Sequence, residues 1–114
     1  MVQYQELDRT LAALADPTRR AVVERLGRDG FATVSELAQP AGISLTGMKK
    51  HLRVLEEAGL VASEKVGRSR QCRLGPNRAE VLATWIEDYR EMVEQRYQRL
   101  DALLARRKEE QHEQ

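Results

Sequence analysis

The sequence predicts a mostly α-helical protein with one small β-hairpin, in the element order α-α-α-α-β-β-α. Two observations support this fold class. Apolar residues recur at the three- to four-residue spacing of a helix face over most of the chain, and the period shortens toward two only over residues 60–74. A chain of 114 residues can bury one modest core but not two. We therefore expect one domain over residues 1–108 and a disordered polar tail at residues 109–114.

The first two predicted helices meet at a proline. The first is expected over residues 3–15, where one stripe holds Tyr4, Leu7, Leu11 and Leu14. It must end at Asp16, because the residue before a proline is pushed out of the helical region. The same Asp16 can cap the second helix, and Pro17 suits its first position, where a missing N–H costs nothing. The second helix ends between Gly27 and Gly30, and its buried face is formed by Val22, Val23 and Leu26.

A short third helix is expected at about residues 34–40. It begins near Thr33 or Ser35, both of which are good capping residues. The run Pro40-Ala41-Gly42 is predicted to break it. Its inward-facing residues are Leu37 and Ala38.

A longer fourth helix follows after a tight turn. Ser44 is the predicted N-cap of a helix over about residues 45–58, and Gly59 is a natural C-terminal stop. The positions that must face the core, three or four residues apart, are Met48, Leu52 and Leu55. The two helices and the turn around Gly42 therefore have the form of a helix-turn-helix.

The next segment predicts a hairpin and then a long helix. Residues 60–66 and 70–74 are short extended stretches separated by Gly67-Arg68-Ser69, which indicates a two-stranded hairpin with a basic tip. A basic hairpin directly after a helix-turn-helix makes a winged helix, in which the hairpin is the wing. The last helix is expected at about residues 77–107, and its apolar stripe holds Val81, Leu82, Trp85, Ile86, Tyr89, Met92, Val93, Tyr97, Leu100, Leu103 and Leu104.

Charge is concentrated in the middle of the chain. The formal net charge of the whole chain is only +1. Residues 44–76 hold seven basic and three acidic side chains, which is +4, whereas residues 1–43 hold five and six and residues 77–114 hold seven and nine. A basic face is therefore carried by the predicted helix-turn-helix and wing, which favours a polyanionic partner such as duplex DNA.

The exposed positions of the fourth helix suit DNA. Thr46 can donate to a base edge or a phosphate, Gly47 permits close approach, and Lys49 is a point charge for phosphates or guanine. The second helix of such a motif enters the major groove, and the hairpin lies along the adjacent backbone or minor groove. The residues we expect to contact DNA are Ser44, Leu45, Thr46, Gly47, Lys49, Lys50, Arg53, Arg68 and Arg70.

Three further residues stay open at this stage. Arg19 and Arg20, at the start of the second helix, suit either a DNA phosphate or a contact within the protein, such as a carboxylate partner for Arg19. His51 lies beside the core positions and is interpreted as structural or phosphate-contacting rather than as a metal ligand.

Three runs of residues resemble the ArsR/SmtB family of bacterial winged-helix regulators. They are Leu14-Ala15-Asp16-Pro17-Thr18-Arg19-Arg20, Val34-Ser35-Glu36-Leu37-Ala38 and the run from His51 to Val61, HLRVLEEAGLV. The resemblance extends over roughly residues 5–105. It implies a homodimer joined through its first and last helices that regulates transcription by occupying promoter DNA. It also places the base-reading positions on Leu45, Thr46 and Lys49, of which Leu45 and Lys49 depart from the polar residues of many relatives.

A dimer is also expected from the apolar stripe of the last helix, which a monomer would leave wet well beyond an ordinary apolar surface patch. The residues predicted to form the dimer interface are Leu7, Leu11, Leu14, Trp85, Tyr89, Met92, Leu100 and Leu104. For the aromatic residues of this stripe, core or interface is the preferred interpretation over an effector pocket.

The sequence gives little support for a metal site or for catalysis. The metal motif of arsenic and cadmium sensors in this family carries cysteine before the recognition helix, but residues 34–39 have none. The last helix offers no histidine before His112, so three or four nitrogen or sulfur ligands cannot gather in one chain. The only cysteine, Cys72, suits a small apolar strand residue better than a redox sensor. No phosphate loop or nucleophile motif predicts an enzyme, and no cofactor is expected.

Taken together, the sequence predicts a cytoplasmic, sequence-specific DNA-binding transcription regulator, most often a repressor in this family. The expected partners are double-stranded DNA, a second copy of the chain, and an unidentified effector or protein co-regulator, with no membrane. The alternative is a winged-helix partner that binds protein instead of DNA, including a metal-responsive one that acts with a second protein. Binding to unrelated duplexes at two salt concentrations separates the two.

Overall fold

The computed structural model describes the backbone of residues 2–113 and the side chains of residues 5–111. Its residues divide into two compact units, 1–82 and 83–114, which we treat one at a time. The first unit holds the predicted helix-turn-helix and hairpin, and the second holds most of the last helix. The side chains of Tyr4 and His112, which entered the sequence predictions, lie outside the described residues.

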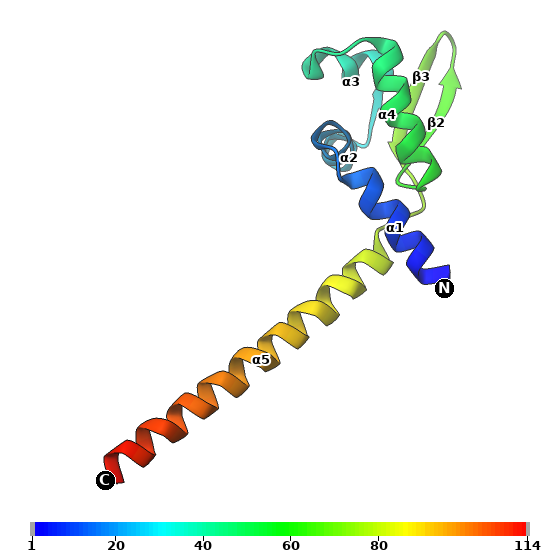
Figure 1. The fold of residues 1–114 in the computed structure, drawn as a ribbon. Helices are drawn as coiled ribbons and strands as arrows, with labels where there is room; N and C mark the ends of the chain where they lie inside the picture. The colour runs from blue at the N-terminus through cyan, green and yellow to red at the C-terminus, as the bar shows by residue number, and fades with distance from the viewer. Residues whose placement is uncertain (1, 114) are drawn as a thin grey trace. The chain divides into compact units, whose positions relative to one another are not determined.

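The first unit follows the predicted order with one strand added (Figure 1). Its elements are α1 (Val2–Leu14), α2 (Pro17–Asp29), β1 (Phe31–Thr33), α3 (Val34–Ala41), α4 (Leu45–Glu57), β2 (Val61–Val66) and β3 (Ser69–Leu74). The sheet has three antiparallel strands in the order β1-β3-β2, against which α2, α3 and α4 pack. The predicted winged helix-turn-helix is confirmed.

Strand β1 was not predicted from the sequence. It is three residues long and pairs with β3, with Ala32 opposite Cys72. A run of three residues is too short to display a two-residue period, and its position is fixed only by the distant strand with which it pairs. The pairing joins the end of α2 to the base of the hairpin.

Side-chain caps define the helix starts as the sequence predicts. The Asp16 carboxylate accepts the backbone N–H of Arg19 at 3.1 Å, and Ser44 Oγ accepts the N–H of Gly47 at 3.0 Å. Between them, Thr33 and Glu36 form a reciprocal capping box at the start of α3. Of the two candidate caps for α3, the structure therefore uses Thr33.

Helix α3 ends within the run Pro40-Ala41-Gly42, as predicted, and Pro40 itself lies inside the helix. The helix continues to Ala41, and Gly42 follows in the left-handed region with φ 67°. A proline has no N–H to donate to the carbonyl four residues earlier, which here is that of Glu36. The guanidinium of Arg25 donates to this carbonyl instead, so α3 loses no hydrogen-bond partner at the proline.

The core of the first unit is built from small and medium apolar side chains. Leu26, Met48, Leu55 and Cys72 are its largest fully buried members. Burial, with Glu56 as the second cause, raises the pKa of the Cys72 thiol to about 11. The thiol therefore stays protonated at neutral pH, as expected of an apolar strand residue.

The last helix, α5 (Glu80–Glu113), starts later and ends later than predicted. Before it, Asn77 accepts the N–H of Ala79, which has φ 61°, so the chain turns before the helix begins. The helix includes residues 109–113, where the sequence analysis predicted a disordered tail. Residues 77–114 contain neither glycine nor proline, and Lys, Glu and Gln are good helix formers, which favours this continuation.

Gly75 provides a direct test of the packing between the hairpin and the end of α4. A Cβ at this position would lie 2.3 Å from the carbonyl oxygen of Gly59 and 3.1 Å from the nitrogen of Val61. We expect Gly75→Ala to lower the free energy of unfolding by about 1–3 kcal/mol, measured by urea denaturation. Gly27→Ala is the matched control, because Gly27 is helical and its Cβ would meet only a side-chain carbon at 4.0 Å. Equal stability of the two variants would contradict the predicted clash.

Candidate nucleic-acid interface

Helix α4 has one buried and one exposed face. Met48, Leu52 and Leu55 are at most 3% exposed and hold the helix on the core. The side chains on the other face point to solvent, and they include Leu45, Thr46, Lys49, Lys50 and Arg53. Gly47 is half-buried beside the cap. The two-faced helix that the sequence predicts is therefore present, with its polar face accessible.

The wing is a hairpin with a tighter tip than predicted. Val66 pairs with Ser69, so only Gly67 and Arg68 form the turn, and Gly67 supports it with φ 62°. Ser69 belongs to β3 rather than to the turn. Arg70 also lies within β3, opposite Lys65, and donates to Ser63 Oγ at 3.1 Å. Arg68 is therefore the tip residue, whereas Arg70 lies on the side of the wing.

The start of α4 and the wing face a common groove of about 370 Å³. Leu45 and Lys49 contribute to it from α4, and the start of α3 lines a third side. Of the side chains 5–111 that line it, four are cationic and none is a carboxylate. The cations are Lys49, Lys65, Arg68 and Arg70. A groove with charges of one sign attracts polyanions. It is therefore suited to a nucleic-acid backbone.

The groove gathers part of the predicted set and adds one residue. Lys50 and Arg53 are exposed on α4 but do not line the groove, and neither do Thr46 and Gly47. Lys65 lines it although the sequence analysis did not select this residue. Its position two residues before the turn, on the strand that carries no other lysine or arginine, could have indicated that it pairs with Arg70.

Arg19 joins the first two helices to α4. Its guanidinium donates to the carbonyls of Ala13 at 2.7 Å and Ala12 at 3.0 Å, and lies 3.3 Å from Nδ1 of His51 on α4. Asp16 completes the cluster, 3.9 Å from the same Nδ1, and its pKa is lowered chiefly by the N–H of Arg19. Of the two roles left open for Arg19, the structure favours a contact within the protein, but with carbonyls and a histidine.

The predicted dimer-interface residues divide into two groups. Leu7 is only 7% exposed, and Leu14 packs against the core, so both are used largely within their own chain. Their place in a dimer interface stays a prediction. The remaining six are 43% to 61% exposed, and these are Leu11, Trp85, Tyr89, Met92, Leu100 and Leu104. The rings of Trp85 and Tyr89 stack with centroids 5.7 Å apart.

The described part of the chain contains neither a metal-binding cluster nor a membrane-spanning helix. Among side chains 5–111, no three His, Cys, Asp or Glu residues come together in a group that could hold a metal ion. None of the described helices is long and apolar enough to cross a membrane.

A basic groove between a recognition helix and a wing defines a winged helix-turn-helix DNA-binding protein. A family model described as a helix-turn-helix domain matches residues 14–64. The HTH-type transcriptional regulator Rv2034 of Mycobacterium tuberculosis is 39% identical over 89 residues, covering 78% of this chain and 82% of that protein. The crystal structure of the ArsR family transcriptional regulator RHA00566 is 41% identical, covering 79% of this chain and 92% of the other, with a TM-score of 0.72.

The chain therefore belongs to the ArsR family of helix-turn-helix transcription regulators. It is a DNA-binding regulator of transcription and not an enzyme. A more distant structure has the same fold, with 23% identity, a TM-score of 0.61, and coverage of 77% of this chain and 81% of the other. It is the homodimeric winged helix-turn-helix domain of Mb0332 from Mycobacterium bovis. The resemblance seen in the sequence is thus confirmed.

The Arg19 cluster generates a test that separates structural from DNA-contacting roles. Arg19→Gln removes two hydrogen bonds to carbonyls and the contact with His51, so we expect the free energy of unfolding to fall by about 1–3 kcal/mol. The matched control is Arg20→Gln, because Arg20 is exposed and its guanidinium donates only to the carbonyl of Leu14. Urea denaturation measures both. If Arg19→Gln weakens DNA binding with no loss of stability, Arg19 is instead a phosphate contact.

Proposed function

We propose that the protein is a sequence-specific repressor that binds a palindromic operator as a homodimer. Residues 44–58 enter the major groove, and the hairpin of residues 64–73 lies along the backbone as the wing. The observation that carries this proposal is the common groove, in which Lys49 of α4 and three cations of the wing meet without a carboxylate. A protein that occupies promoter DNA excludes other proteins from that DNA, and this is the basis for proposing a repressor. The site of action is then the cytoplasm, where bacterial promoters are found.

Within this site, different residues are assigned to contact the DNA bases and the DNA phosphates. Leu45, Thr46 and Lys49 lie on the first turns of α4, from which side chains reach base edges in helix-turn-helix proteins. Leu45 is 49% exposed, which suits contact with a thymine methyl group. Arg68, at the wing tip, and Lys50 and Arg53, farther along α4, are placed for phosphates, which fix position without reading sequence.

A homodimer would supply the second half-site. The described side chains of α5 include a run of exposed apolar residues from Trp85 to Leu104, and the stacked pair of Trp85 and Tyr89 belongs to it. Covering such a stripe with a second copy removes it from water. The fold neighbour Mb0332, itself homodimeric, is consistent with this arrangement. Two copies then place two recognition helices one helical turn of DNA, or a multiple of it, apart.

Base-reading residues and phosphate-contacting residues are expected to respond differently to substitution. Thr46→Ala or Lys49→Ala should reduce discrimination at one operator position by about 1–3 kcal/mol, because a base contact is lost. Arg68→Ala should weaken all duplexes alike and make the salt dependence shallower by about one unit per lost phosphate contact, hence about two for a dimer. Titration of operator and scrambled duplexes at several salt concentrations measures both effects.

Lys108→Ala is the control for these variants, because it removes an exposed cation of α5 that does not line the groove. It should leave the salt dependence unchanged. Equal loss of specific and non-specific binding in Thr46→Ala, Lys49→Ala and Arg68→Ala would refute the division of roles. If none of the three changes DNA binding, the winged helix is better explained as a protein-binding module.

The dimer is tested on α5. Leu100→Glu with Leu104→Glu places charges in the apolar stripe, so we expect monomers at micromolar concentration and a loss of operator affinity. The control pair, Gln98→Glu with Ala102→Glu, adds the same charge on the same helix away from that stripe. Analytical ultracentrifugation measures the mass of each variant. A native protein that sediments as a monomer at micromolar concentration contradicts the proposed dimer.

A further inference from the structure

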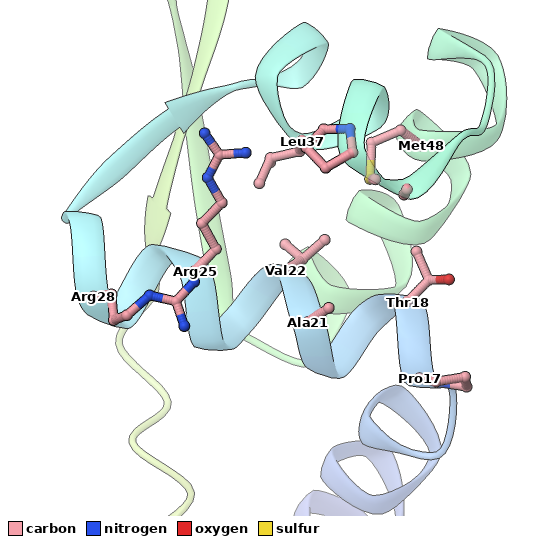
Figure 2. A pocket seen from close by; sticks show the side chains of 10 residues that line it. Pro17, Thr18, Ala21, Val22, Arg25, Arg28, Leu37 and Met48 are labelled. Carbon is pink, nitrogen blue, oxygen red and sulfur yellow. The ribbon is translucent and has the colours of Figure 1, made fainter.

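A second groove, of about 550 Å³, lies between α2 and α3 in the first unit (Figure 2). Its lining includes Val22 and Leu37 from the two helices and Met48 from α4, all of which belong to the buried core. Pro17 and Pro40 add rigid apolar walls. The volume falls within the range of about 300–1,000 Å³ typical of small-molecule sites. None of its lining residues lines the basic groove described above, so the two are separate sites.

The charged groups of this second groove are of one sign. Among the described side chains, Arg25 and Arg28 are its only ionisable lining residues, and no carboxylate lines it. Arg25 reaches from α2 toward α3 in Figure 2 and is already partnered, by Asp29 at 3.3 Å and by Glu36 at 3.8 Å. Arg28 makes no hydrogen bond or ion pair with any described side chain. The groove therefore combines an apolar floor with one guanidinium that is available to an anion.

We propose that this groove binds a small apolar carboxylate, with its apolar body over Val22, Leu37 and Met48 and its anionic end at Arg28. Burying apolar surface against the floor drives binding, and a charge-assisted hydrogen bond to the guanidinium selects a carboxylate over a cation. Both features are needed, because an exposed arginine alone holds an anion only weakly. A neutral or cationic molecule of the same shape lacks the second contribution.

The position of the groove links its ligand to the DNA-binding helix. Met48 is fully buried and lies between Gly47 and Lys49, and Pro40 lies at the end of α3, just before the turn into α4. A ligand that wedges between α2 and α3 thus touches both helices of the helix-turn-helix. If it binds one spacing of these helices better than another, it changes the affinity for DNA by the same coupling factor. This regulatory part rests on the proposed DNA-binding function, whereas ligand binding does not.

Calorimetric titration of the full chain with three probes tests the site. Octanoate provides the anion and the apolar body, octylamine reverses the charge, and butyrate keeps the charge on a shorter body. We expect octanoate to bind at least about tenfold more tightly than either of the others. Equal affinity for octanoate and octylamine would overturn the proposal, as would equal affinity for octanoate and butyrate.

Two variants place the site. Arg28→Gln should weaken octanoate binding at least about fivefold, because the charge-assisted hydrogen bond is lost, while operator affinity without ligand stays within about twofold. Ala21→Phe should block the groove, since Ala21 lines it and is exposed. Arg20→Gln removes the same charge from the same helix outside the groove and should have no effect on octanoate binding. Unchanged octanoate binding in both Arg28→Gln and Ala21→Phe would overturn the assignment.

The regulatory part is measured separately. Saturating octanoate should change operator affinity by at least about threefold in the native chain, and not in Ala21→Phe, as expected for coupled sites. Octanoate binding without any change in operator affinity would refute the regulation and leave the site in place. If the chain instead binds no operator at all, the proposed function fails, and the calorimetric titrations still decide the groove.

Discussion

The placement of α4 depends on three buried side chains that occupy one face of the helix. Met48, Leu52 and Leu55 are held in the core, and this fixes the rotation of the helix about its axis. Because side chains in a helix repeat every 3.6 residues, Thr46, Lys50 and Arg53 must then lie on the opposite side. Lys49 lies between the two faces, and Leu45 is exposed at the first turn of the helix. The exposed surface of α4 is thus a consequence of core packing. A change in the core would rotate these exposed residues, including those proposed to read bases.

Polar contacts at the middle and at the C-terminal end of α4 add to this packing. Near its middle, His51 meets Arg19 and Asp16 of the α1–α2 junction. At its C-terminal end, Asn77 donates to the carbonyl of Ala58 at 2.7 Å and to Thr10 Oγ1 of α1 at 3.1 Å. Thr10 is only 3% exposed, so its hydroxyl needs such a partner. These contacts join α1 to α4 without adding apolar bulk, and they use residues that hydrophobic periodicity cannot single out.

The sequence was informative where structure is decided locally. Asp16 and Ser44 cap helices because of interactions within three residues, and the two faces of α4 follow from its own period. The sequence was uninformative where the local structure depends on contacts with a segment far away along the chain. β1 exists through its pairing with β3, Pro40 is tolerated because Arg25 satisfies the carbonyl it leaves free, and Lys65 reaches the groove through the register of the hairpin. The base-reading and dimer residues remain predictions, because a partner molecule decides them and the packing within one chain does not.

The small net charge of the chain is compatible with a polyanionic partner because attraction to DNA acts over short distances. At physiological ionic strength the Debye length is about 8 Å, so a phosphate in the basic groove responds mainly to the cations that line it. Acidic residues more than a Debye length away contribute little. In a homodimer each chain would contribute the same four groove cations. The net charge of each chain would still be only +1. In the proposed dimer, local segregation of charge would thus favour DNA over other polyanions whose charges do not match the spacing of the two grooves.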